Sequence, residues 1–325
     1  MNRKSYSQLI ITIIIVCLAL ATFWCSKNRS KSVAGQSNEV LPPLTSAWQN
    51  VDQFLNTTNS ISFDTLAAEL VNIITNNVYG KFSIYLEDLN SGVWLGINEN
   101  EKYDTWSLLK VPVMITILKK VELKALPLDY KVPLKGRKLD TYAHRNVEDI
   151  TEDKISVRKL IERLIVFSDN TASGILALFF TPDEFQQCLL AVGLPQVPAG
   201  KPRNSVPRVS PRQYSNMLRS LYYSGYLKNP FCQLALSLMS ETIYASQIRM
   251  GLPENIKVSH KVGYNAGSGD FHDCGIIYFS NRPYILSVMS THSTRNEADR
   301  VISLISKKIY EHFLNFYKSF PNNSK

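Results

Sequence analysis

A serine and a lysine three positions apart form the first pair in this sequence that could perform chemistry. Ser107 and Lys110 lie within residues 104–112, where polar residues lead into an apolar stretch typical of a helix start. On a helix this spacing puts both side chains on one face, so the Lys110 amine could take the proton of the Ser107 hydroxyl. Free N–H groups at the helix N-terminus could hold the oxyanion that forms when such a serine attacks a carbonyl group.

The spacing alone is weak evidence, because Ser156 and Lys159 repeat it in what reads as an ordinary solvated helix. Two further motifs follow in the chain: Ser168-Asp169-Asn170 in a helical region and Lys261-Val262-Gly263 at the end of a predicted strand. Each also has a purely structural interpretation, since the first is made of helix-capping residues and Lys261 could be an exposed lysine at a strand end. The evidence for catalysis is the combination and order of the three motifs.

Composition excludes several function classes. The 325 residues, 45% of them hydrophobic, can bury one large core or two smaller ones. The net charge of +9 suits contact with anionic surfaces, but the charges are dispersed and no nucleic-acid motif occurs, so we expect no nucleic-acid partner. No His or Cys spacing indicates a metal site, so we expect neither a metal nor another cofactor. Cys188, Cys232 and Cys274 are interpreted as buried small hydrophobes, with a Cys188–Cys232 disulfide as the alternative.

The N-terminus predicts export. Residues 9–24 are mostly apolar and uncharged, with basic residues on both sides. Residues 1–25 are therefore a signal peptide or a membrane anchor. The length and the charged far flank favour an uncleaved anchor, whereas Ala19-Leu20-Ala21 would suit cleavage and a lipid-modified Cys25 is a weaker third interpretation. We expect an exported, extracytoplasmic protein anchored by residues 9–24, with residues 26–60 as a flexible linker rich in Ser, Asn, Thr and Pro.

Hydrophobic periodicity predicts the order helix, two strands, a helical block, three strands and a helix. The two strand groups lie far apart in sequence, so the simplest α+β architecture is one antiparallel five-stranded sheet flanked by helices, with an all-helical insertion as a second lobe. The domain would span residues 61–320. Its sheet lobe would comprise residues 61–100 and 257–320, and its helical lobe residues 101–256.

Two details of this layout concern the site. Pro112 lies inside the helix predicted to run from Ser107 to about Leu123, and it removes a backbone bond to the Leu108 carbonyl, so we expect a bend there. Residues 195–211 contain five prolines and are expected to form neither a regular helix nor a central strand.

The three motifs resemble those of class A β-lactamases and closely related penicillin-binding domains, whose elements are Ser-x-x-Lys, Ser-Asp-Asn and Lys-Thr-Gly. The resemblance covers roughly residues 61–318 and is carried mainly by residues 105–113 and 167–174. It implies a β-lactamase/transpeptidase-like fold. It also implies a serine hydrolase that forms an acyl-enzyme on a β-lactam or on a peptidoglycan-type peptide.

The resemblance implies a role for each motif residue. Ser107 would be the nucleophile and Lys110 its base, Ser168 would relay a proton to the leaving nitrogen, and Lys261 would hold the Ser168 hydroxyl and attract the substrate carboxylate. The backbone N–H groups of Ser107 and Tyr264 would form the oxyanion hole. The substrate-binding residues would be Asn170, Gly263, Tyr264 and Tyr142. Tyr142 would be an aromatic residue at the mouth of the site, although it could equally be an ordinary loop tyrosine.

The sequence departs from the family pattern in two places. The loop that carries the deacylating glutamate and an asparagine in class A enzymes corresponds to residues 195–211, which contain no Asp or Glu. We therefore expect slow deacylation. Val262 replaces the usual threonine of the third motif, and the loss of a hydroxyl that would bond a carboxylate removes a contact of about 1.5–3 kcal/mol.

Three functions remain open from the sequence. The first is a serine β-lactamase-like hydrolase with slow turnover. The second is a penicillin-binding D,D-peptidase or β-lactam sensor, and the third is a catalytically inactive cell-surface binding module. The expected partners are a small-molecule β-lactam or a peptidoglycan stem peptide, together with the membrane through the N-terminal segment. The chain is expected to be a monomer.

Overall fold

The computed structural model describes residues 61–76, 80–134, 153–196, 207–245, 247–280 and 282–319. Tyr142, the N-terminal segment and residues 197–206 of the proline-rich loop lie outside the described residues, so the predictions made for them are untested. Within the described ranges, none of the helices combines the length and the apolar content needed to cross a membrane.

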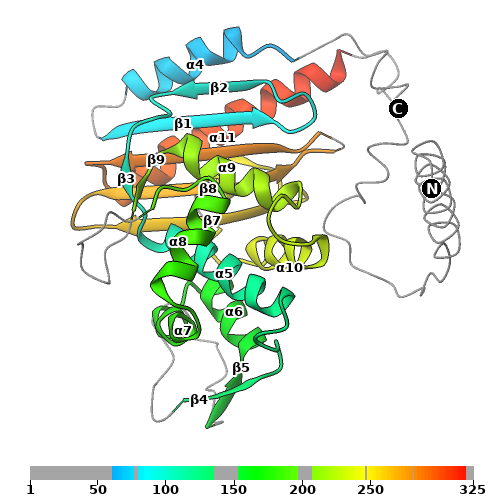
Figure 1. Ribbon diagram of the computed structural model, residues 1–325. Coiled ribbons are helices and arrows are strands. Elements are labelled where there is room, and N and C mark those ends of the chain that lie inside the picture. The colour runs from blue at the N-terminus through cyan, green and yellow to red at the C-terminus, as the bar shows by residue number, and fades with distance from the viewer. Residues whose placement is uncertain are drawn as a thin grey trace, which may run out of the picture. The chain divides into compact units, whose positions relative to one another are not determined.

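A five-stranded antiparallel sheet is the centre of the fold, as predicted (Figure 1). Its strand order is β2-β1-β9-β8-β7, so β7 lies at an edge. The pairing of β1 with β9 extends from Lys81 opposite Thr291 to Asp88 opposite Tyr284, and it brings strands from before and after the helical block into one sheet. The strands of the sheet are β1 (Lys81–Asp88), β2 (Trp94–Ile97), β7 (Lys257–Asn265), β8 (Asp270–Tyr278) and β9 (Tyr284–Thr291).

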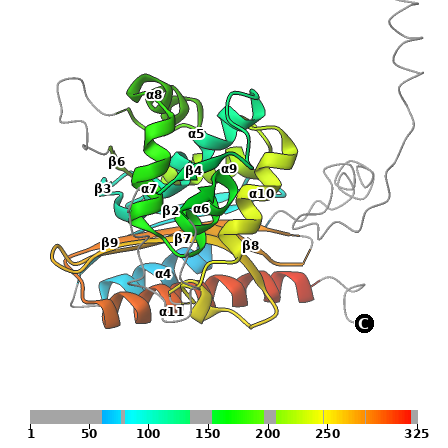
Figure 2. The same cartoon turned by 90° about the horizontal axis from the view of Figure 1, so that it is seen from below.

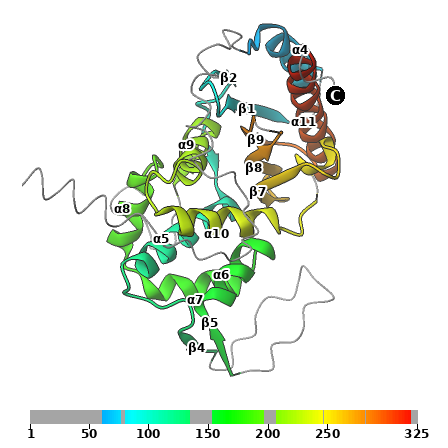
Figure 3. The same ribbon diagram turned by 90° about the vertical axis from the view of Figure 1, so that its right-hand side faces the viewer.

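Helices cover both faces of this sheet. On one face lie α4 (Asp64–Thr75) and the long α11 (Arg295–Lys318), and the helical block lies on the other (Figure 2). Within the block, α5, α6 and α10 pack side by side (Figure 3). The block contains α5 (Lys110–Glu122), α6 (Val157–Val166), α7 (Asn170–Leu176), α8 (Pro182–Ala191), α9 (Pro211–Tyr222) and α10 (Asn229–Ser240). Short 3-10 helices are η1 (Trp106–Leu109), η2 (Ala177–Phe179) and η3 (Arg249–Gly251).

Among the described residues, two short antiparallel pairings lie outside the main sheet. β3 (Tyr103–Asp104) pairs with β6 (Arg208–Val209), and β4 (Lys131–Pro133) pairs with β5 (Lys154–Ser156). The first pairing connects the end of the proline-rich loop with the residues that precede Ser107. Residues 195–211 thus include one two-residue strand beside the predicted site, which the prolines did not indicate.

The two faces of the sheet carry separate hydrophobic cores. One core joins α4 and α11 to side chains such as Phe82, Leu286 and Phe271, and the other joins the helical block to the opposite face through Ile276 and Met289. The three described cysteines are buried and free, so the alternative of a Cys188–Cys232 disulfide is wrong in this structure. Burial raises the pKa of all three thiols, which keeps them neutral and apolar in character.

The helix predicted from Ser107 to Leu123 is not one continuous α-helix. A 3-10 turn over Trp106–Leu109 precedes the α-helix, which begins at Lys110. Pro112 therefore lies in the first turn of α5, where its missing N–H is no loss, rather than at an internal bend. The Leu108 carbonyl instead accepts a hydrogen bond from the buried hydroxyl of Tyr214 at 3.1 Å.

Candidate active site

The 3-10 turn η1 brings Ser107 and Lys110 together. Side chains three residues apart eclipse one another on a 3-10 helix, whereas on an α-helix they diverge by about 60°. Lys110 Nζ lies 2.8 Å from Ser107 Oγ, and the Lys110 side chain is buried. The spacing that predicted a nucleophile and a base thus yields direct contact where η1 joins α5.

Contacts with the sheet fix the turn in place. Trp106, which has a φ of +45°, donates from Nε1 to Asp270 Oδ2 at 2.9 Å. His272 Nε2 lies 3.0 Å from the Asp104 carbonyl oxygen. At Gly263, an added Cβ would lie 2.9 Å from both Leu108 Cγ and the Thr105 carbonyl, so only glycine allows edge strand β7 to approach this closely. The predicted substrate-binding residue Gly263 therefore sets the distance between β7 and η1.

The Ser168-Asp169-Asn170 motif combines a helix cap with a set of polar groups that face the lysine. Asp169 is the N-cap of α7 and accepts from the Ala172 N–H at 2.9 Å, while its other carboxylate oxygen accepts from Arg163 Nε at 2.7 Å. Ser168 directly before the cap has a φ of +55°, a conformation that is costly for a residue other than glycine. The capping interpretation is thus correct for Asp169, while Ser168 and Asn170 on either side of it contact the Lys110 amine.

All four predicted catalytic residues meet in one network of contacts. Lys110 Nζ donates to Asn170 Oδ1 at 2.7 Å and to Ser168 Oγ at 3.2 Å. Lys261 Nζ reaches the same Ser168 hydroxyl from β7 at 3.0 Å. Three motifs separated by up to 154 positions in sequence, from Ser107 to Lys261, therefore converge on a single hydroxyl group.

Lys261 is fully buried, and its ionisation is strongly perturbed. The pKa of its amine is lowered from 10.5 to about 7, chiefly because burial disfavours the charged form; repulsion from Lys110 contributes to the shift, and attraction to Asp273 opposes it. Its ammonium form is satisfied by Ser168 Oγ and by the Val262 carbonyl at 3.0 Å. Lys261 can thus change its protonation state near neutral pH, and it is not the exposed strand-end lysine of the structural alternative.

A family model described as the β-lactamase enzyme family matches residues 65–313, which includes the whole of this site. The chain belongs to this family. Among curated relatives, β-lactamase SME-1 of Serratia marcescens is 21% identical over 260 residues, covering 74% of this chain and 87% of that protein. β-Lactamase L2 of Stenotrophomonas maltophilia is 31% identical over 99 residues, covering 30% of this chain and 32% of that protein.

Solved structures of the family share the fold at low sequence identity. The structure of PBP-A has a TM-score of 0.67 at 18% identity and covers 80% of this chain and 100% of its own. An ancestral class A β-lactamase has a TM-score of 0.66 at 22% identity, covering 76% of this chain and 99% of its own. The predicted β-lactamase/transpeptidase-like fold is therefore confirmed.

Tyr264 and Val262, the remaining residues considered in or next to the third motif, lie beside this site on β7. Tyr264, whose N–H was assigned to the oxyanion hole, is 42% exposed, and its ring stacks on Phe271 while the Arg295 guanidinium lies 4.3 Å from its centroid. Val262 is buried and lies opposite Asp273 in the β7–β8 pairing.

The two histidines beside the third motif, His260 and His272, make structural contacts. His260 Nδ1 lies 2.8 Å from Asp273 Oδ1, and His272 bonds the Asp104 carbonyl. Burial lowers the pKa of His272, which favours its neutral form.

Sequence reasoning missed Tyr244, which no motif marks. Its ring lies beside Lys261, with the amine nitrogen 5.4 Å from the ring centroid. No sequence pattern identifies Tyr244, because the segment that follows α10 brings it beside Lys261 only in the folded chain.

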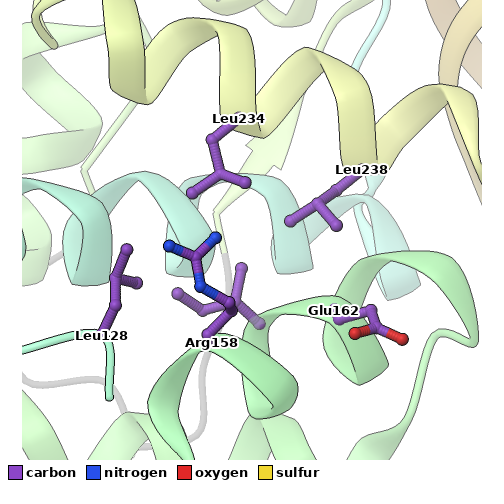
Figure 4. A pocket seen from close by; sticks show the side chains of 6 residues that line it. Leu128, Arg158, Glu162, Leu234 and Leu238 are labelled. Carbon is purple, nitrogen blue, oxygen red and sulfur yellow. The ribbon is translucent and has the colours of Figure 1, made fainter. Parts of the chain in front are cut away.

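No other part of the described residues offers a comparable group of reactive side chains. They contain no cluster of three or more His, Cys, Asp or Glu side chains that could hold a metal ion. A small cavity of about 130 Å³ lies between α6 and α10, and Figure 4 shows the aliphatic side chains of Leu128, Leu234 and Leu238 around Arg158. None of the four predicted catalytic residues lines it. The chemistry is concentrated where β7 meets α5 and the Ser168 turn.

The ionisation of Lys261 leads to a prediction about stability. The unfolded chain binds a proton at Lys261 up to a pKa of about 10.4, and the folded chain only up to about 7. Burial of the protonated amine therefore lowers the free energy of unfolding by its full amount below pH 7, and this penalty shrinks as the pH rises toward 10. Replacing Lys261 by methionine should raise the free energy of unfolding, and this increase should be largest below pH 7 and smaller at higher pH.

Urea denaturation of both proteins at pH 6 and pH 9.5 measures this difference. Lys257→Met is the matched control, because Lys257 is an exposed lysine on the same strand. A Lys261→Met effect that is the same at both pH values would contradict the buried, neutralisable state of this amine.

Proposed function

We propose that this protein is a serine hydrolase that forms an acyl-enzyme at Ser107 with a β-lactam or a peptidoglycan-type peptide, and that it releases the acyl group slowly. The observation that carries the proposal is the contact network from Ser107 through Lys110 and Ser168 to Lys261, with distances of 2.8, 3.2 and 3.0 Å. A buried base beside a hydroxyl nucleophile is the arrangement that activates serine for acyl transfer.

Acylation would proceed in two proton-balanced steps. The Ser107 oxygen attacks the substrate carbonyl carbon as its proton passes to a neutral Lys110 amine. The resulting oxyanion is held by the backbone N–H groups of Ser107 and Tyr264. The C–N bond then breaks, and the leaving nitrogen receives a proton from Ser168, which is replenished from the lysines that bond it. Asn170 would position the substrate by a hydrogen bond to its acyl-amide group.

The shared hydroxyl explains how one lysine can be neutral. Lys110 and Lys261 both contact Ser168 Oγ, so two ammonium groups would repel each other across one oxygen atom. This repulsion contributes to the lowered pKa of Lys261 and favours a state in which only one of the two amines is charged. A base and a cation can therefore coexist in one buried site.

The acid-free loop supports slow release and hence the second candidate function, a penicillin-binding D,D-peptidase or β-lactam sensor. Residues 195–211 supply no carboxylate that could activate a water molecule against the acyl-enzyme. Among the structures with this fold, a mutant of PBP-A is described as an acyl-enzyme complex with penicillin G, with a TM-score of 0.66. A fold of this type therefore holds a penicillin acyl group in at least one neighbour.

Export and membrane anchoring are part of the same proposal. The apolar segment at residues 9–24 and the polar linker at residues 26–60 support a position outside the cytoplasm, where peptidoglycan and β-lactams are met.

Intact-mass analysis after incubation with benzylpenicillin tests the proposed function. We expect one adduct on the wild-type protein and on Ser156→Ala, which removes the serine of the repeated Ser-x-x-Lys spacing, and none on Ser107→Ala. Persistence of the adduct for hours supports the sensor or slow peptidase, whereas loss within seconds indicates an efficient β-lactamase. A folded wild-type protein that forms no adduct, with either a penicillin or a D-Ala-D-Ala peptide, would overturn the proposal in favour of a binding module.

A further inference from the structure

The segment after α10 packs against the residues that lead into Ser168. Thr242 Oγ1 and the Ile243 N–H both approach the Val166 carbonyl, at 3.5 and 3.4 Å. The Tyr244 hydroxyl donates to the Phe167 carbonyl at 3.4 Å. These distances are at the long end of the hydrogen-bond range, so each contact is weak. Together they involve the two carbonyl groups that directly precede the Ser168 turn.

The face of the Tyr244 ring is turned to the Lys261 amine, 5.4 Å from the ring centroid. The negative face of an aromatic ring attracts an ammonium group, and the attraction is strongest where water is excluded. Lys261 is among the largest fully buried side chains of the described residues. The ring therefore acts on a desolvated cation rather than on a solvated one.

The charged groups around Lys261 have opposing effects on its ammonium form, so the ring can affect the balance between them. Lys110 on α5 repels the ammonium form, and Asp273 on β8 attracts it. The Asp273 carboxylate is shared, because it also accepts from His260 Nδ1 at 2.8 Å and from the Ile248 N–H at 3.0 Å. Cys274, opposite Lys261 in the β7–β8 pairing, remains a neutral thiol since burial raises its pKa.

The strained backbone of Ser168 must also be held in place by its surroundings. Its φ of +55° is maintained only where the surroundings hold the turn in place. The Arg163–Asp169 pair holds the turn from one side, and the 242–244 segment contacts its backbone through Val166 and Phe167.

We propose that Tyr244 is a positioning residue of this site: its ring keeps Lys261 in the ammonium form that donates to Ser168, and its hydroxyl fixes the turn that carries Ser168. The catalytic consequence rests on the proposed acylation of Ser107, but the effect on Lys261 does not. Loss of the ring lowers the pH at which Lys261 loses its proton, and loss of the hydroxyl alone leaves that pH unchanged.

The first measurement is the pH dependence of acylation by benzylpenicillin, followed by intact mass. In the wild type we expect the rate to fall as Lys261 deprotonates above about pH 7. Tyr244→Leu should move this alkaline limb down by about 0.5–1 pH unit. Tyr244→Phe, which keeps the ring, should leave the limb in place and slow acylation by about twofold to tenfold. Tyr130→Leu, at a half-exposed tyrosine of the helical block, is the matched control and should change neither.

The second measurement does not depend on catalysis. The 13C resonance of the Lys261 methylene next to Nζ, assigned by its absence in Lys261→Met, reports the protonation of the amine directly. The midpoint of its titration should fall in Tyr244→Leu and stay in place in Tyr244→Phe. If the leucine variant does not fold, as judged by thermal unfolding, Tyr244→Met provides the same loss of the ring with a longer and more flexible side chain.

The outcomes separate the two proposals. An unchanged Lys261 midpoint in a folded ring-less variant overturns the role of the ring, and wild-type acylation by Tyr244→Phe overturns the role of the hydroxyl. A shifted midpoint in a protein that never forms a Ser107 adduct would overturn the proposed function and leave the electrostatic role of Tyr244 standing.

Discussion

Replacing Lys110 by methionine is expected to slow acylation of Ser107 by about 10²- to 10⁴-fold, the usual contribution of a positioned general base. The Lys110 amine lies 2.8 Å from Ser107 Oγ, so it is the group in place to receive the proton as the serine attacks. Methionine has a similar length and suits the buried position, but its thioether cannot take that proton. The measurement is the rate of adduct formation with a labelled penicillin.

The same variant should also alter the ionisation of Lys261. Because Lys110 is one of the causes of the lowered Lys261 pKa, its removal should raise that pKa above about 7. The alkaline limb of the residual acylation would then move to higher pH, in the direction opposite to that expected for Tyr244→Leu. Lys159→Met, which removes the exposed lysine of the second Ser-x-x-Lys spacing, should change neither the rate nor the limb. A Lys110→Met protein that is acylated at the wild-type rate would remove Lys110 from the mechanism.

The fold was predictable because its signals are local and repeated. Alternating side chains marked the strands, and helical periodicity with caps marked the helices; the Thr181 capping box, for example, marks the start of α8. The distance in sequence between the two strand groups then left one sheet as the simplest solution. The β1–β9 pairing over eight residues confirms that step.

The geometry of the site was only partly predictable. The turn at Ser107 packs against Gly263 and accepts a hydrogen bond from Tyr214, and these are tertiary contacts that the local sequence does not reveal. The continuous helix predicted from Ser107 was wrong, since a 3-10 turn occupies Trp106–Leu109 and the α-helix begins only at Lys110. The low pKa of Lys261 and the contact with Tyr244 depend on burial between elements far apart in the chain, and no spacing rule encodes them.

The buried Arg163–Asp169 pair leads to the largest expected effect on stability. Both side chains are almost fully buried, and Arg163 Nε lies 2.7 Å from Asp169 Oδ2. Asp169→Asn retains an oxygen that can cap α7 but removes the negative charge facing a buried guanidinium. Removal of one partner from such a pair typically costs about 3–5 kcal/mol of folding free energy. Urea denaturation at pH 7 measures the change.

Two comparisons test the cause of this loss. In the double variant Arg163→Met with Asp169→Asn, no buried charge faces a neutral partner, so most of the stability should return. Glu162→Gln, which breaks the exposed pair with Lys159, should cost no more than about 1 kcal/mol. If the double variant is as unstable as Asp169→Asn, the uncompensated charge is not the cause.

The double variant also separates stability from positioning. Ser168 lies directly before Asp169 and holds its strained backbone only while the turn is fixed. If the ion pair serves folding alone, the stable double variant should be acylated at the wild-type rate. We expect slower acylation instead, by about tenfold, because a displacement of 1 Å in a positioned group can cost up to about a hundredfold in rate. A buried ion pair that could be replaced without loss of stability would then be retained for the placement of the Ser168 hydroxyl between the two lysines.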